Sequence, residues 1–230
     1  MVQSEELERT VRELARRAGI DESLAVADFQ GKLREVLLLY PPKFPGQRWA
    51  LLGLGAEPGP RQLIAAMRSF LQGRGAGLPP RVGISLLEGG ERLSTPPMLE
   101  ALVTGWLTGR YRVGKYKTGK EPEGFREEQV EIACCGMDGS REEALERGRV
   151  LAETQQRLMD LVNAPANRKS TEELAAWARE AGRRFGFEVR VWGKRELREQ
   201  GFEALLAVNR GSEQPPAFIM MEYRPKGLPA

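Results

Sequence analysis

The spacing of apolar residues changes near residue 140, and this change constrains the fold more than any other feature of the sequence. Before it, short apolar runs typical of buried strands alternate with stretches in which apolar residues recur every three or four positions. Strands that alternate with helices predict an α/β layer domain. The expected strands are "REVLLLY", "RWALLGLG", "RVGISLL", a shorter one near "YRVGKYK" and "VEIACC"; the expected helices cover residues 4–18, the stretch from Leu63 to Leu71 and that from Met98 to Trp106.

After residue 140 the pattern becomes that of one long helix. "REEALERGRVLAETQQRLMDLVN" predicts about twenty helical residues, roughly 30 Å in length, which is enough to cross from one domain to another. Pro165 prevents this helix from continuing. A new helix is expected from Ser170, because Ser-Thr-Glu-Glu fits a capping box in which Glu173 reaches back.

The remainder predicts a short α/β segment. The new helix is expected to bury Leu174, Ala178, Ala181 and Phe185. We expect strands at "FEVRVW", "EALLAVNRG" and "PAFIMMEY", with a short helix at "KRELREQG".

The sequence contains no histidine, which excludes several kinds of active site. Histidine-based triads, histidine-ligated zinc and an imidazole general base are ruled out. The net charge of +3 is too small to require a polyanionic partner. No apolar run reaches the length of a membrane span, and the two cysteines, Cys134 and Cys135, are adjacent and cannot join distant segments. We therefore expect a cytoplasmic protein without membrane contact.

Two loops carry sequence patterns that also occur in phosphate-binding or nucleic-acid-binding sites. "LLGLGAEPG" lies between a predicted strand and a predicted helix, as a phosphate loop does, but Pro58 stands where a dinucleotide-binding loop has its third glycine. A tight turn is the favoured interpretation. "RYRVGKYKTGK" interleaves basic and aromatic residues, which suits nucleic acid, although a strand edge protected by lysines explains it as well.

Two segments closely resemble the leucyl aminopeptidases, cytosolic two-metal exopeptidases that remove N-terminal residues from peptides. They are "TQQRLMDLVNAPANRKSTEELA" and "ALLAVNRGSEQPPAFIMMEYRP". Looser counterparts of the family's N-terminal domain are "ADFQGK", "RWALLGLG", "TGRYRVGKYKT" and "VEIAC". The resemblance covers nearly everything from about Phe29 to Pro225.

The resemblance implies an α/β chain in three parts. Residues 1–140 would form a macro-like N-terminal domain, residues 141–164 a linking helix and Asn-Ala-Pro junction, and residues 165–230 the incomplete beginning of an α/β, zinc-peptidase-like catalytic domain. Four junction residues are the predicted site residues, in a structural role: Asn163, Pro165, Asn167 and Ser170. The asparagines are expected to bond backbone groups left unpaired by the broken helix, and Ser170 is expected to cap the next one.

The family holds two divalent metals, such as zinc or manganese, through a lysine, several aspartates and a glutamate. In the family these begin after the strand that matches "AFIMMEY", and Lys226–Gly227 lies in the preceding loop. We therefore assign no catalytic residue, no metal ligand and no cofactor to this chain. The expectation is the N-terminal portion of a leucyl aminopeptidase, truncated before the metal site and inactive alone.

Two kinds of partner follow from this expectation: a second copy in a homo-oligomer, or a complementary C-terminal aminopeptidase chain. The alternative function is a non-catalytic macro-like module that regulates or binds nucleic acid. Salt-dependent retention on duplex DNA would favour that alternative.

Overall fold

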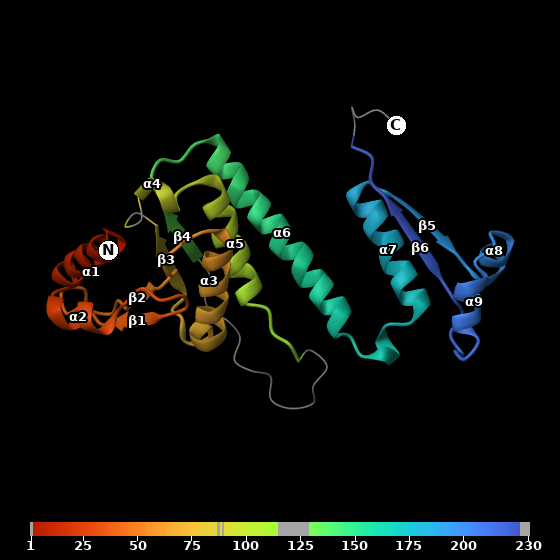
Figure 1. Cartoon of the computed structure of the whole chain (residues 1–230), viewed down its shortest axis with the longest axis horizontal. Helices are drawn as coiled ribbons and strands as arrows, with labels where there is room; N and C mark the ends of the chain where they lie inside the picture. The colour runs from red at the N-terminus through yellow and green to blue at the C-terminus, as the bar shows by residue number, and fades with distance from the viewer. Residues whose placement is uncertain (1, 87, 89, 115–128, 226–230) are drawn as a thin grey trace. The chain divides into compact units, whose positions relative to one another are not determined.

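The computed structural model describes residues 2–86, 88, 90–114 and 129–225 (Figure 1). The chain divides into two compact units, Met1–Met159 and Asp160–Ala230. Both units combine helices with strands, as expected of an α/β protein.

The first unit contains two pairs of strands and a set of helices that pack on them. Its elements are α1 (Val2–Ala18), α2 (Glu22–Asp28), β1 (Val36–Leu39), β2 (Trp49–Leu52), α3 (Pro60–Arg74), η1 (Gly75–Gly77), β3 (Arg81–Ser85), α4 (Gly90–Leu93), α5 (Pro96–Gly109), β4 (Gln129–Ala133) and most of α6 (Gly139–Asn163). The predicted helices and the strands at "REVLLLY", "RWALLGLG", "RVGISLL" and "VEIACC" are confirmed.

The four strands form two separate ladders within the described residues. β1 and β2 pair antiparallel as a hairpin, with Leu37 opposite Leu51. β3 and β4 pair in parallel, with Gly83 opposite Glu131. Partly buried side chains from all four strands pack against one core cluster, so the strands cover the same helical layer.

That helical layer is built around α3 and α5, which lie side by side (Figure 1). Its fully buried side chains include Leu71, Leu99 and Leu102. The two helices approach closely because Gly105 faces the backbone of Ile64, where an added Cβ would lie 2.9 Å from Cα. α6 packs along α5, and two side-chain hydrogen bonds connect them: Thr104 bonds the Gly148 carbonyl, and Gln156 bonds the Leu107 carbonyl.

A smaller cluster joins α1 to α2. Val11 and Ala15 of α1 pack with Ala25 and Phe29. Gly19 ends α1 at φ +79°, a backbone conformation that favours glycine.

The second unit contains η3 (Ala166–Arg168), α7 (Thr171–Phe185), β5 (Glu188–Trp192), α8 (Lys194–Glu199), α9 (Glu203–Asn209) and β6 (Phe218–Glu222). β5 and β6 pair antiparallel, with Val191 opposite Ile219. α7 packs on this ladder through small residues, and Gly182 is needed because an added Cβ would lie 2.6 Å from Val189 Cγ2. At the end of the β5–β6 ladder where Trp192 pairs with Phe218, three aromatic rings contact one another. The rings of Trp192, Phe202 and Phe218 have centroid separations of 5.2–5.7 Å.

Three sequence expectations differ from the structure. "EALLAVNRG" is not a strand: residues 203–209 form α9, because glutamate, alanine and leucine favour a helix. Phe185 is not in the core, since its side chain is 54% exposed at the last residue of α7. The strand expected near "YRVGKYK" is absent from residues 110–114, which form a turn and bend, and residues 115–117 lie outside the described residues.

Candidate functional site

The junction between α6 and α7 holds the four site residues that the sequence predicts. The regular helix bonding of α6 continues to Ala164, whose N–H donates to the Asp160 carbonyl at 3.0 Å. Pro165 then takes extended backbone angles and starts the single turn of η3. Asn163 and Asn167 are both exposed at this break.

One carbonyl group at the end of α6, that of Val162, has a partner that was not predicted from the sequence. Lys169 Nζ donates to the Val162 carbonyl oxygen at 2.9 Å, back across the break. A cation at the C-terminal end of a helix also complements the helix dipole. The signal was available, since Lys169 is a basic residue shortly after a helix-ending proline.

Ser170 begins α7 with the predicted capping box. The Glu173 N–H donates to Ser170 Oγ at 3.2 Å, and the Ser170 N–H donates to Glu173 Oε2 at 2.7 Å. The bond from the Ser170 backbone, followed by that from its hydroxyl, holds the pKa of Glu173 below its ordinary value. A carboxylate that stays ionised in the first turn of a helix also matches the helix dipole.

The two sequence blocks that carry the family resemblance meet in the second unit. Thr171 Oγ1, in the first turn of α7, donates to the Pro215 carbonyl at 2.8 Å. Asn209 Nδ2 donates to the Gln214 carbonyl at 3.0 Å and holds the same loop from the end of α9. The start of α7 is therefore bonded directly to the loop that leads into β6.

The glycines of "LLGLGAEPG" are explained by packing rather than by a ligand. An added Cβ at Gly53 would lie 2.0 Å from the Lys32 carbonyl oxygen. Gly55 has φ +82°, and its N–H donates to the Gly31 carbonyl at 2.9 Å. These glycines let the chain at residues 31–35 pass close to the end of β2, which agrees with the turn that we favoured.

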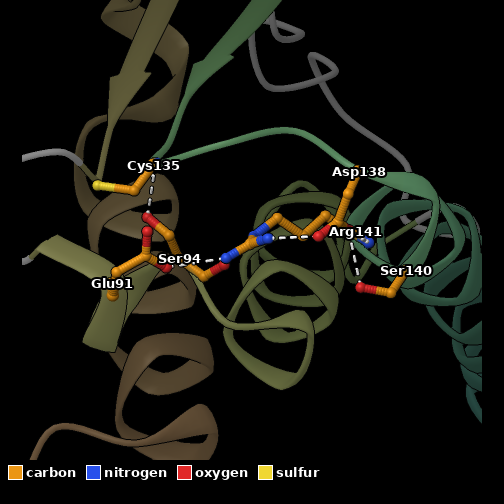
Figure 2. Close-up of polar contacts among 6 residues, drawn as sticks. All are labelled: Glu91, Ser94, Cys135, Asp138, Ser140 and Arg141. Atoms are coloured by element: carbon orange, nitrogen blue, oxygen red, sulfur yellow. Dashed lines mark hydrogen bonds and ion pairs between the residues drawn. The ribbon is translucent and has the colours of Figure 1, made fainter.

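A second polar cluster lies at the carboxyl ends of β3 and β4, where ligands bind in many α/β proteins (Figure 2). Arg141 lies at its centre: Nε donates to the Ser94 carbonyl at 2.9 Å, Nη1 contacts Asp138 at 2.6 Å and Nη2 contacts Glu91 at 2.8 Å. Ser94 is fully buried, and its hydroxyl accepts the Cys135 N–H at 2.9 Å.

This cluster connects three segments of the first unit. The Asp138 carboxylate caps the start of α6 by accepting the Arg141 N–H at 2.9 Å and the Ser140 hydroxyl at 2.7 Å. These bonds, first that from the Arg141 backbone, lower the pKa of Asp138. The Arg141 guanidinium pairs with Ser94, Asp138 and Glu91, so it connects these three segments of the unit (Figure 2).

The described residues hold no cluster of side chains typical of a metal site. Among them, no three histidine, cysteine, aspartate or glutamate side chains come together in a way that could hold an ion. Lys226–Gly227 lies outside the described residues. Within the described part of the chain, no helix is both long enough and apolar enough to span a membrane.

Comparison with known proteins places these features in a family. Residues 157–230 match "Cytosol aminopeptidase family, catalytic domain". A probable cytosol aminopeptidase of Chlorobaculum tepidum is 46% identical over 137 residues, which cover 55% of this chain and 27% of that protein. One from Chlorobaculum parvum is 32% identical over 249 aligned residues, which cover 98% of this chain and 48% of that protein.

The chain is thus similar to the cytosol (leucyl) aminopeptidases, and its residues 157–230 match that family's catalytic domain. It spans about half the length, or less, of the curated relatives that it matches.

Solved structures show the same fold. A mutant of tomato leucine aminopeptidase superposes with a TM-score of 0.77 at 22% identity, over 91% of this chain and 42% of that one. The bottromycin maturation enzyme BotP in complex with Mn gives a TM-score of 0.69 at 23% identity, over 93% and 42% of the two chains.

Proposed function

We propose that residues 1–230 are the N-terminal portion of a leucyl aminopeptidase, in which a macro-like domain leads through α6 into the start of the catalytic domain. One observation carries the proposal: the match to the family's catalytic domain begins at residue 157, and the second compact unit begins at residue 160. Sequence similarity and the folding of the chain thus divide it at nearly the same position. In the proposal the catalytic domain starts just after this position, at residue 165, where the linking helix and junction end.

The proposed role of the junction is to fix the direction in which the chain enters that domain. Pro165 stops α6, while Lys169 and Ser170 satisfy backbone groups on the two sides of the break. The bond from Thr171 to the Pro215 carbonyl attaches the start of α7 to the loop before β6. In this proposal Asn163, Pro165, Asn167 and Ser170 act through the backbone and contact no substrate.

Two bound divalent metals would supply a metal-activated water for attack on the scissile peptide carbonyl. The described residues do not fit such a site, because they bring together no set of donors for a metal. We therefore derive no metal-dependent step from them. The proposal assigns hydrolysis to residues outside positions 1–230 and expects this chain to be inactive on its own.

Reconstitution tests this proposal. The 230-residue chain would be mixed with a separately produced C-terminal portion of the Chlorobaculum parvum relative, taken from beyond the aligned part. We expect the two to co-elute in gel filtration, and only the mixture should hydrolyse leucine p-nitroanilide with manganese. An unrelated protein at equal concentration serves as the control.

Two results would contradict the proposal. Hydrolysis by the 230-residue chain alone, abolished by a chelator, would place the active site within it. Salt-dependent binding to duplex DNA, combined with no association with the C-terminal portion, would instead support the non-catalytic module.

A further inference from the structure

The sequence contains one aspartate that precedes a glycine, at Asp138–Gly139. The other aspartates precede glutamate, phenylalanine or leucine, and no asparagine precedes a glycine. In an Asp-Gly pair the glycine nitrogen can attack the carboxyl carbon of the aspartate, because glycine has no side chain to shield that nitrogen and its backbone turns freely. This pair is therefore the place where the backbone of the chain rearranges most readily.

The rearrangement converts aspartate to isoaspartate in two steps. First, the Gly139 nitrogen bonds to Cγ of Asp138 and gives up its proton, which leaves with one carboxyl oxygen as water, and a five-membered imide ring closes. Water then adds to one of the two imide carbonyl groups and breaks its bond to the nitrogen. Opening at the main-chain carbonyl leaves a backbone that runs through Cβ and Cγ, with the former backbone carbonyl as a free carboxylate. The water lost in the first step is regained in the second, so no other reactant is needed.

Gly139 presents no obstacle to this attack. The residue is exposed, and an added Cβ would have nothing within 4 Å. It is also the first residue of α6, where a backbone N–H has no carbonyl of the helix as its acceptor. Its nitrogen is therefore open to water. Protection against the reaction has to come from Asp138.

The Asp138 carboxylate is directed along α6 by bonds to the residues that follow Gly139 (Figure 2). Oδ1 accepts the Ser140 hydroxyl at 2.7 Å and the Arg141 N–H at 2.9 Å, and Oδ2 contacts Arg141 Nη1 at 2.6 Å. The Asp138 backbone carbonyl accepts the N–H groups of Arg141 and Glu142 at 3.1 and 3.0 Å. Ring closure requires rotation about both the Cα–Cβ and the Cα–C bonds of this N-cap residue, because an N-cap has extended backbone angles. The rotation would break the bonds of both groups.

Arg141 cannot follow the carboxylate as it turns, because two further groups hold its guanidinium. Nε donates to the carbonyl of the fully buried Ser94 at 2.9 Å, and Nη2 contacts Glu91 at 2.8 Å. The Arg141 side chain is only 16% exposed. The arginine is thus fixed to the body of the first unit and holds the Asp138 carboxylate in one orientation.

The same contacts keep the Asp138 carboxylate ionised. The bond from the Arg141 backbone, followed by that from the Ser140 hydroxyl, holds the pKa of Asp138 below its ordinary value. Nucleophilic attack proceeds on the protonated acid, whose oxygen leaves as water, whereas the negative charge of the carboxylate repels the nitrogen. Charge and orientation therefore act in the same direction.

We propose that Asp138–Gly139 is the site of isoaspartate formation in this chain, and that Arg141 is the positioning residue that slows the reaction. The reaction follows local opening of the first turn of α6, because the carboxylate must be released before the ring can close. Isoaspartate then adds an atom to the backbone at the start of α6 and removes the cap. Arg141 keeps Ser94 and Glu91 but loses its connection to this helix.

The rate of isoaspartate formation tests the proposal. The 230-residue chain, its Arg141→Met variant and an acetylated, amidated peptide with the sequence of residues 136–143, "GMDGSREE", would be incubated at one temperature and neutral pH. Isoaspartate at position 138 is followed by mass spectrometry with electron-transfer fragmentation. We expect the folded chain to react at least about tenfold more slowly than the peptide, because only the opened form reacts. Arg141→Met should recover roughly tenfold, because the bonds that oppose opening are lost.

Three control variants separate the role of Arg141 from a general loss of stability. Gly148→Ala forces α5 and α6 apart away from the cap and should leave the rate unchanged. Arg147→Met removes a neighbouring arginine that pairs with other carboxylates, and it should also have no effect. Gly139→Ala places a methyl group beside the attacking nitrogen and should lower the rate in the folded chain and in the peptide alike.

Three results would overturn the proposal. Equal rates in the folded chain and in the peptide would show that the fold gives no protection. An Arg141→Met rate equal to that of the wild type, or matched by Gly148→Ala, would remove the specific role of Arg141. Faster formation of isoaspartate at Asp21, Asp28 or Asp160 would place the labile site elsewhere.

Discussion

The Lys169 ammonium group lies 2.9 Å from the backbone oxygen of Val162, seven residues earlier in the chain. Pro165 lies between the two and makes the break that this bond closes. A single side chain thus satisfies one carbonyl group at the end of α6 and connects it to the residue that follows η3. The junction is ordered by this bond together with the cap at Ser170.

Lys169→Met keeps the length of the side chain and removes the bond to Val162. We expect the second unit to lose about 1 kcal/mol, the usual contribution of a partly exposed hydrogen bond. Amide exchange at residues 162–164 should rise, because the last turn of α6 loses its partner. Lys194→Met, at an exposed site on α8, is the matched control and should change neither quantity.

Ser170→Ala removes the cap of α7. The loss should be about 1 kcal/mol, measured by urea unfolding, because the Glu173 N–H loses its acceptor. Ser23→Ala, at an exposed position in the first turn of α2, should change stability by less than about 0.5 kcal/mol. Equal effects of the two substitutions would show that the capping box does not stabilise α7.

Glu173 makes the stability of the second unit depend on pH. Its pKa is lowered in the folded chain, first by the hydrogen bond from the Ser170 backbone. A lowered pKa means that the contribution is complete above the unfolded value of about 4.3 and is lost as pH falls through the folded value. Glu173→Gln should therefore be less stable than the wild type at pH 7, and the difference should shrink as urea unfolding is repeated toward pH 3. A constant difference across that range would contradict this.

Arg141 should stabilise the first unit more than its ion pairs alone suggest. Its side chain is only 16% exposed, and it bonds the carbonyl of the fully buried Ser94. Arg141→Met should cost about 1–2 kcal/mol in urea unfolding, and Arg141→Lys should recover little, because one ammonium cannot reach all three partners. Glu91→Gln, which changes a side chain that is 74% exposed, should cost less than about 0.5 kcal/mol.

Two glycines of α6 give a matched pair. An added Cβ at Gly148 would lie 2.6 Å from the Glu100 carbonyl oxygen, whereas at Gly139 nothing lies within 4 Å. Gly148→Ala should therefore destabilise the first unit by about 1–3 kcal/mol, because α5 and α6 must move apart. Gly139→Ala should be neutral or slightly stabilising. Thermal unfolding of both variants checks the prediction, and equal melting temperatures would contradict it.

The sequence predicts local structure where particular residues carry a strong signal. Pro165 ends α6 because it cannot continue the helical bonding, and Ser170 begins α7 because its neighbours complete a capping box. The alternation of "FEVRVW" likewise indicates β5. In each case the deciding atoms lie within about four residues of one another.

Segments without such a local signal were decided by tertiary structure. "EALLAVN" is apolar enough for a buried strand, yet it forms α9, and Phe185 continues the stripe of α7 but stays exposed. The bond from Arg141 to Ser94 joins positions 47 residues apart, and no spacing in the sequence predicts it. The sequence by itself determined the ends of elements that carry a local signal, such as the end of α6 at Pro165 and the start of α7 at Ser170, because the bonding there is local. Only the tertiary structure decided which faces are covered, because burial depends on distant segments of the chain.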